Sequence, residues 1–272
     1  MVYNTHHITH PVTIHTLKQL KHKGDKFVCI ALYDAPTATI AQNQGIEVLL
    51  VGDSLGMTVQ GHSSTLPVTM EHMAYHTSAV SRGNHKSLII ADMPFMSYST
   101  TEQAMHNAGL LMQAGANIVK LEGGEWLAET IYKLSERGIP VCAHLGLTPQ
   151  SVNKFGGFRV QGKEQGQADN ILKDAKLLDQ AGADLIVLEC IPTELATTIT
   201  QSVKMSTIGI GAGQMTDAQV LVINDIIGLT AKPPRFSKNF LSEAGSIAEA
   251  MTLFRDQVKA GDFPTENHTF RL

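Results

Sequence analysis

Short apolar runs recur along the chain, and most of them end at a polar or charged residue. Runs of this length with apolar side chains on both faces are typical of buried parallel strands. The pattern therefore predicts a largely parallel sheet of eight strands. The runs are Phe27–Tyr33, Val48–Gly52, Leu88–Asp92, Ile118–Leu121, Val141–Leu145, Leu185–Glu189, Thr207–Ile210 and about Gln219–Ile223.

Helical segments separate these strands. The predicted helices run from Asp34 to about Gln44 and over Val68–Ser81, Thr101–Ala114, Trp126–Arg137 and Ala168–Ala181. A glycine follows several of them, where a left-handed cap lets the chain turn into the next strand, as in QNQGIEVLLVGDS and QAGADLIVLEC. Alternating strands and helices imply parallel pairing with right-handed crossovers. Eight such units predict an α/β protein with a (β/α)8 TIM barrel.

An open doubly wound sheet is the alternative architecture. It requires a glycine-rich fingerprint directly after the first strand. The sequence there is Tyr33-Asp34-Ala35-Pro36, which contains no glycine. Residues 1–272 are therefore interpreted as one barrel domain.

Segments outside the repeating pattern complete this interpretation. Residues 1–26 are expected to form a histidine-containing tail and a short amphipathic helix, Thr13–His22, that caps one end of the barrel. Ser246–Ala260 is predicted to be a final amphipathic helix. Two connections, 56–67 and 146–167, are long enough to be functional loops, and residues 147–167 are interpreted as a mobile lid over the site.

Composition narrows the possible partners and the compartment. The net charge is −4 and no Lys/Arg run occurs, which argues against nucleic acid. No apolar run approaches the roughly 20 residues of a membrane span. The three cysteines have no metal-type spacing and lie in or beside apolar runs, so buried free thiols in a reducing, cytoplasmic compartment are expected.

Acidic side chains stand at or near the ends of several predicted strands. In a barrel, the carboxyl ends of the strands meet at the catalytic face, which would bring Asp53, Asp92 and Glu122 together. Converging carboxylates repel one another unless a cation neutralises them. Oxygen-only ligands favour a hard divalent ion, so these three residues are predicted to bind Mg²⁺, although other divalent ions remain possible.

Other polar side chains at the same face are candidates for substrate binding and proton transfer. Lys120 either binds a substrate carboxylate or pairs with Glu122 on the same strand face. Glu189, among apolar neighbours in LIVLEC, is either a general base or a structural carboxylate held by a neighbour. His144 either polarises a substrate oxygen or is a hydrogen-bonded structural histidine. Ser54 either contacts the substrate or caps a turn.

Several long strings resemble ketopantoate hydroxymethyltransferases. They are VGDSLGMTVQGHSSTLPVT, ADMPF, AGANIVKLEGGEW, VCAHLGLTPQSVNKFGGF, LIVLEC, IGIGAG and FSKNF, and they extend over nearly the whole chain. The resemblance implies a TIM barrel of the phosphoenolpyruvate/pyruvate superfamily type, assembled as a decamer of two pentameric rings. It also implies that a hydroxymethyl group passes from 5,10-methylenetetrahydrofolate, the co-substrate, to 3-methyl-2-oxobutanoate through a Mg²⁺-stabilised enolate, in pantothenate synthesis.

The resemblance also implies roles for particular residues. Asp53 and Asp92 would ligate Mg²⁺, Glu122 would complete the site directly or through water, Ser54 and Lys120 would hold the keto acid, and Glu189 would be the base. Asn224 stands before Asp225 where the family commonly has His-Asp. The nearest alternative activity is a Mg²⁺-dependent 2-keto-acid aldolase or lyase that needs no folate. A non-catalytic barrel that serves as a scaffold is the alternative outside enzymes.

Overall fold

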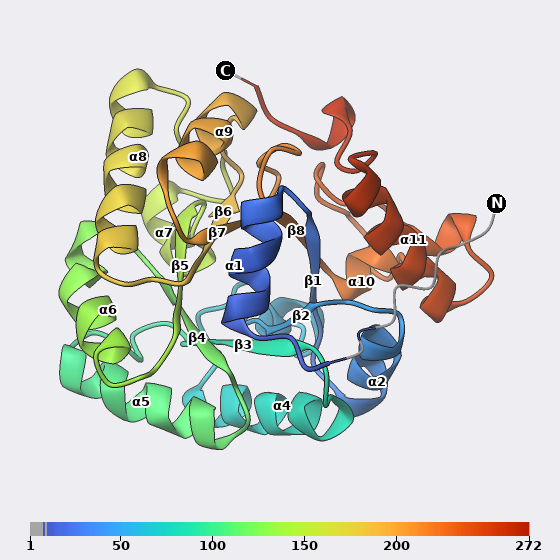
Figure 1. The fold of residues 1–272 in the computed structure, drawn as a ribbon, viewed down its shortest axis with the longest axis horizontal. Helices are drawn as coiled ribbons and strands as arrows, with labels where there is room; N and C mark the ends of the chain where they lie inside the picture. The colour runs from blue at the N-terminus through green and yellow to red at the C-terminus, as the bar shows by residue number, and fades with distance from the viewer. Residues whose placement is uncertain (1–7, 9, 272) are drawn as a thin grey trace.

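Eight parallel strands close into a barrel in the computed structural model, which describes residue 8 and residues 10–271 (Figure 1). Each strand pairs with the next in the chain, and β8 pairs with β1. The predicted barrel is confirmed, and the open sheet is wrong. The strands are β1 Phe27–Ala31, β2 Val48–Val51, β3 Leu88–Asp92, β4 Ile118–Glu122, β5 Val141–Gly146, β6 Leu185–Glu189, β7 Ser206–Ile210 and β8 Ala218–Val222.

Helices surround this barrel and connect its strands (Figure 1). The α-helices are α1 Ile14–Lys23, α2 Ala35–Asn43, α3 Leu55–Thr58, α4 Met70–Gly83, α5 Thr101–Gln113, α6 Ala128–Ser135, α7 Val152–Phe155, α8 Gln165–Gln180, α9 Thr193–Ser202, α10 Ile223–Ile226 and α11 Ile247–Ala260. Short 3₁₀ turns are η1 Glu125–Leu127, η2 Pro149–Ser151, η3 Leu241–Glu243 and η4 Glu266–His268. Each predicted helix is present with small differences at its ends.

Alternate residues of each strand point inward and outward, as the period of a β-strand requires. Along β1, Cys29 packs among the side chains inside the barrel, whereas Val28 and Ile30 pack in the layer between barrel and helices. On β4 the outward residues are Val119 and Leu121, so Lys120 and Glu122 face the interior. Strand β4 therefore places two charged side chains, Lys120 and Glu122, inside the barrel.

Helix α1 closes the end of the barrel opposite the carboxyl ends of the strands, as predicted. Thr13 and Thr16 form a reciprocal capping box at its start, and Gly24 ends it in a left-handed conformation. Leu17 is fully buried against the interior side chains. The Lys21 ammonium lies 2.8 Å from an Asp217 oxygen, which fixes the helix to the segment before β8. Most of the predicted tail over residues 1–10, namely residues 1–7 and 9, lies outside the described residues.

The structure adds short elements that the hydrophobic pattern did not reveal. The connection after β2 begins with α3, and the segment 147–167 contains η2 and α7. The predicted helix over Trp126–Arg137 starts as η1 before α6. Helix α9 was not predicted because its threonine-rich sequence, TELATTITQS, obscures the helical period. These differences leave the order of the strands unchanged.

Two further observations bear on the sequence predictions. Cys29, Cys142 and Cys190 are free and buried. Within the described residues, none of the helices combines the length and the apolar character needed to cross a membrane.

Candidate active site

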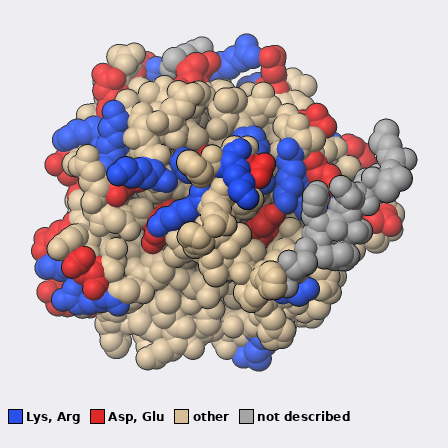
Figure 2. All heavy atoms as spheres, in the orientation of Figure 1, with Lys and Arg blue, Asp and Glu red and all other residues tan. Residues whose placement is uncertain are grey.

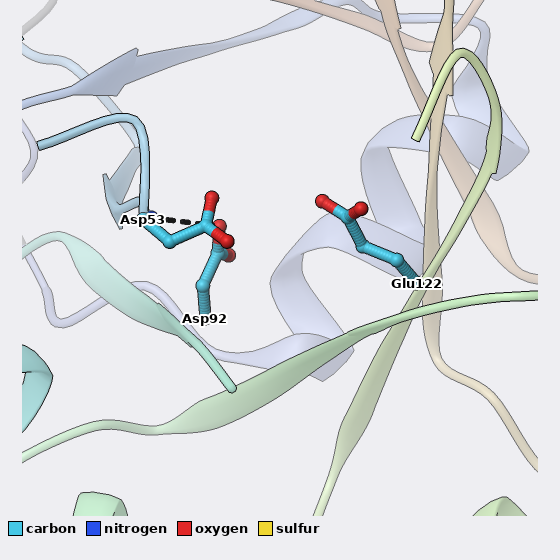
Figure 3. Close-up of side chains that lie close together, drawn as sticks. All are labelled: Asp53, Asp92 and Glu122. Carbon is cyan, nitrogen blue, oxygen red and sulfur yellow. Dashed lines mark hydrogen bonds between the residues drawn. The ribbon is translucent and has the colours of Figure 1, made fainter. Parts of the chain in front are cut away.

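Three carboxylates converge at the carboxyl ends of neighbouring strands. Asp53 follows β2, Asp92 ends β3 and Glu122 ends β4. One oxygen from each lies within 4.8 Å of the others, and all three residues are buried. Figure 3 shows the side chains pointing toward one another, with the Asp53 backbone N–H donating to an Asp92 oxygen at 3.1 Å. The structure thus brings the three predicted metal ligands together.

The electrostatics of this acidic triad favour a bound cation. Burial, and then the charges of Glu122 and Asp92, raise the pKa of Asp53 well above its ordinary value. Burial likewise raises the pKa of Asp92. The Asp92 Oδ1 atom is buried and accepts no hydrogen bond from any described residue, which is costly unless a ligand satisfies it. An all-oxygen set with one unsatisfied oxygen fits a hard divalent ion such as Mg²⁺.

Lys120 lies among these carboxylates. Its ammonium nitrogen is 3.1 Å from an Asp92 oxygen and 3.5 Å from a Glu122 oxygen. Burial alone would lower the pKa of Lys120, but the surrounding carboxylates raise it above the ordinary value, so the side chain stays protonated. The predicted ion pair with Glu122 is present. Lys120 also lines the cavity described below, where its charge can face a substrate.

His144 and Glu189 lie next to Glu122. His144 Nδ1 is 3.3 Å from a Glu122 oxygen, and Nε2 is 3.3 Å from a Glu189 oxygen. Burial and Lys120 lower the pKa of His144, but Glu122 and Glu189 outweigh them and raise it to about 9. Glu189 lines the cavity, whereas His144 is buried behind the two carboxylates. Direct contact between His144 and a substrate stays a prediction.

Ser54 stands at the edge of the same group. Its hydroxyl is 2.8 Å from the hydroxyl of buried Tyr33, and Ser54 lines the cavity. A Cβ atom at Gly52 would lie only 2.8 Å from Ser54 Oγ and 3.5 Å from Asp92 Oδ2. Gly52 therefore allows the serine hydroxyl and the acidic triad to approach each other closely.

Gln150 is a residue at this site that the sequence analysis did not identify. Its side-chain N–H donates to Asp53 Oδ2 at 2.8 Å, and its backbone N–H donates to Glu122 Oε2 at 3.1 Å. The Tyr98 hydroxyl donates to its side-chain oxygen. An amide in a polar loop carries no sequence signal for such a position, so only the folded structure reveals it.

A cavity of about 590 Å³ opens above these groups. Asp53, Asp92, Lys120, Glu122 and Glu189 line its floor. Both long connections contribute to its walls, through residues 57, 58 and 65 after β2 and residues 147, 149 and 158–160 after β5. Segment 147–167 therefore contributes to the wall of the cavity, and its role as a mobile lid stays a prediction.

The fold and the site define a (β/α)8-barrel protein with a buried acidic centre suited to a divalent cation. Solved structures share this fold: phosphonopyruvate hydrolase in complex with oxalate and Mg²⁺ aligns with a TM-score of 0.61, at 12% identity, over 94% of this chain and 93% of that chain. Phosphoenolpyruvate phosphomutase from Streptomyces platensis subsp. rosaceus aligns with a TM-score of 0.60, at 13% identity, over 79% and 82%. At such low identity, the likeness establishes the fold alone.

Sequence comparison gives the family. The model of the family described as ketopantoate hydroxymethyltransferase matches residues 11–266, and the chain belongs to this family. It is 60% identical to the 3-methyl-2-oxobutanoate hydroxymethyltransferase of Saccharophagus degradans, over 99% of this chain and 100% of the relative. It is 57% identical to the protein of the same name from Proteus mirabilis, over 96% and 99%.

Proposed function

We propose that the chain transfers a hydroxymethyl group from 5,10-methylenetetrahydrofolate to 3-methyl-2-oxobutanoate, giving 2-dehydropantoate for pantothenate and coenzyme A synthesis. The observation that carries this proposal is the acidic triad, which lies in one cavity with Lys120 and Glu189. Two highly identical relatives bear the name of this activity. The cavity combines a cation site, a positive charge and a carboxylate base, which the reaction requires.

Asp53, Asp92 and Glu122 are the residues that would hold Mg²⁺. When bound, the ion polarises the 2-keto group and offsets negative charge on the enolate oxygen. Lys120 adds a positive charge inside the same cavity and, with the Ser54 hydroxyl, is proposed to bind the keto-acid carboxylate. Gln150 holds one oxygen of Asp53 and one of Glu122 in place through its hydrogen bonds.

Glu189 is proposed to accept the proton from C3 of the keto acid. Its carboxylate faces the cavity and lies within 3.3 Å of His144, which limits its orientation. The electron pair released at C3 forms the bond to the one-carbon unit. Both bonds between the one-carbon unit and the folate nitrogens break, and one water supplies the product's hydroxyl oxygen. Of the three protons that the water and C3 release, two end on the folate nitrogens and one on the product's hydroxyl.

Proton exchange at C3 tests the first step without any folate. The methyl doublet of 3-methyl-2-oxobutanoate should collapse to a singlet in D₂O by NMR when protein and Mg²⁺ are present, and EDTA should stop the exchange. Absence of exchange with tetrahydrofolate also present would refute the substrate and base assignments. Turnover of the keto acid to cleavage products without folate would instead favour the aldolase or lyase alternative.

The proposal extends to assembly and location. Exposed apolar side chains Tyr75, Leu110 and Tyr132 stand on the neighbouring helices α4, α5 and α6, and they support assembly into the homodecamer that the family resemblance implies. The surface over the lower part of Figure 2, where α4 and α5 lie in Figure 1, carries few charged groups. The buried free thiols support a reducing, cytoplasmic location.

A further inference from the structure

A further buried acid, which is not part of the acidic triad, lines the cavity. Asp225 lies in the short helix α10, which follows β8, and its side chain faces the same cavity. The Thr230 hydroxyl donates a hydrogen bond to its Oδ1 atom. Burial raises the pKa of this carboxyl group. Neither the metal site nor the proton transfer described above uses Asp225, so its buried charge lacks an assigned role.

The chemistry of this acid matches one part of the co-substrate. A buried carboxylate is stabilised by N–H donors, and two parallel donors form the strongest arrangement. The 2-amino-4-oxo-pyrimidine edge of a pterin presents a ring N–H beside an amino group, which is such a pair. The keto acid, by contrast, carries a negative charge of its own and would be repelled by Asp225.

Aromatic side chains form the wall around this part of the cavity. Phe158, Phe236 and Phe270 all line it, and Phe158 is 52% exposed although it borders the site. Phe236 and Phe270 pack against Gly211, where a Cβ atom would lie 3.1 Å and 3.0 Å from their rings. An exposed aromatic side chain at a cavity wall is well suited to stack on a flat ring.

Cations line the mouth of the cavity beside these rings. They are Arg159, Lys232 and Arg235. The Arg235 guanidinium carbon is 5.6 Å from the centre of the Phe270 ring, and its Nε donates to the Asn267 carbonyl at 3.1 Å. Its remaining N–H groups are suited to a carboxylate. The charges therefore divide the cavity into an acidic floor and a basic mouth.

We propose that the outer part of this cavity is the pteroylglutamate site, with Asp225 accepting hydrogen bonds from the amino-pyrimidinone edge and the mouth cations binding the glutamate carboxylates. This inference rests on the proposed function, because it assigns its folate co-substrate. The keto acid occupies the floor of the cavity, and Arg159, Lys232 and Arg235 provide cations for the anionic tail at the mouth, so the tail extends outward. The ring then lies between Asp225 and the phenylalanines, beside the keto acid.

Two probes separate the ends of the ligand. One is 5-formyltetrahydrofolate, a stable reduced folate, and the other is p-aminobenzoylglutamate, which lacks the pterin. Calorimetric titration should show that Asp225→Asn weakens binding of the first by about 10–100-fold, as expected for loss of charged hydrogen bonds, and changes binding of the second less than about twofold. Asp174→Asn, on α8 and outside the cavity, should change neither.

The cations provide the complementary test. Arg235→Gln and Lys232→Gln should weaken both probes, because both carry glutamate carboxylates. Equal binding of the reduced folate to wild type and Asp225→Asn would overturn the assignment. The assignment would also be overturned if Asp225→Asn weakened the binding of both probes equally. It would be overturned as well if the reduced folate failed to bind a wild type that exchanges the keto-acid proton.

Keto-acid exchange distinguishes this inference from the proposed function. Wild type should exchange the C3 proton with Mg²⁺ alone, because that step uses the floor of the cavity and needs no folate. If wild type shows no exchange even with tetrahydrofolate present, the proposed function fails. If wild type exchanges the proton but Asp225→Asn binds 5-formyltetrahydrofolate as tightly as wild type does, only the assignment of the pteroylglutamate site fails.

Discussion

At the scale of single residues, the site depends on how each carboxylate is surrounded. Glu122 has two cations beside it, and although burial opposes ionisation, Lys120 and His144 lower its pKa. For Asp53, burial raises the pKa, and the two neighbouring carboxylates, Glu122 and Asp92, raise it further. Residues of one chemical type thus differ because their neighbours differ.

Glu189→Gln removes the proposed proton acceptor while preserving the shape of the side chain. C3 exchange should fall by at least about 10²–10⁴-fold, the usual contribution of a general base. Keto-acid binding, measured by calorimetry with Mg²⁺, should remain within a few-fold of wild type. Retained exchange, or a loss of keto-acid binding, would contradict the assignment.

Gln150→Leu removes the side-chain hydrogen bond to Asp53 but keeps the backbone donor to Glu122. Mg²⁺ affinity should fall by about 10–100-fold, as is typical when a group that orients a metal ligand is lost. Gln161→Leu is the control, since Gln161 is also a buried glutamine of segment 147–167 but bonds Gln167 instead.

Tryptophan fluorescence can report this titration. The protein has one tryptophan, Trp126, and its ring stacks on Tyr98, whose hydroxyl contacts Gln150. Mg²⁺ should change the emission of wild type and of Gln161→Leu at similar concentrations. An unchanged midpoint in Gln150→Leu would show that this glutamine does not position the site.

At the scale of elements, one end of the barrel contributes to stability and the other end forms the active-site cavity. Helix α1 fills the closed end with Leu17, whereas the loops at the other end form the cavity. Substitutions at the closed end are therefore expected to change the free energy of unfolding, and substitutions at the open end are expected to change ligand binding and catalysis, as in other barrels of this architecture.

Leu17→Ala should lower the free energy of unfolding by about 2–5 kcal/mol, because it leaves a cavity under the barrel. Urea denaturation measures this loss, and Gln19→Ala on the exposed face of α1 is the control. Mg²⁺ affinity should stay the same in both variants, since the metal site lies at the opposite end. A large drop in affinity would show that the two ends are coupled.

The lid hypothesis for residues 147–167 predicts protection from protease. Trypsin should cleave after exposed Lys154 or Arg159, and Mg²⁺ with keto acid should slow that cleavage, because the loop contacts the loaded site through Gln150. Cleavage after Lys23, at the other end of the barrel, should be unaffected. Mass spectrometry identifies the fragments, and equal rates with and without ligands would contradict a lid.

At the scale of the whole molecule, the outer helices carry exposed apolar side chains. Apolar side chains on α4, α5 and α6 remain exposed in the single chain, while the active-site cavity opens at the carboxyl ends of the strands. Assembly through the outer helices would bury apolar surface without blocking substrate entry.

Light scattering after size-exclusion chromatography should therefore show a high-order oligomer, a decamer by the family resemblance. Replacing Tyr75 and Leu110 together by glutamate should reduce its size, because charged groups are costly in an apolar interface. Circular dichroism should confirm that the variant remains folded. A monomeric wild type would refute the proposed assembly.

The sequence by itself determined the architecture and much of the candidate site. Strand runs such as Leu88–Asp92 and Leu185–Glu189 match the observed strands at both ends. Period-two alternation placed Lys120 and Glu122 on one face. These features were predictable because strand period, apolar runs and glycine caps are local properties of the chain.

Only the tertiary structure decided which loop side chains join the carboxylates at the ends of the strands. Gln150 contacts Asp53 across 97 positions of sequence, and Asp225 shares a cavity with Phe158 and Arg159 from another loop. Loop side chains carry no periodic signal, since their positions depend on how the ends of eight strands are arranged around the barrel. The same holds for the charge on each group, because burial and neighbouring charges arise only when the chain is folded.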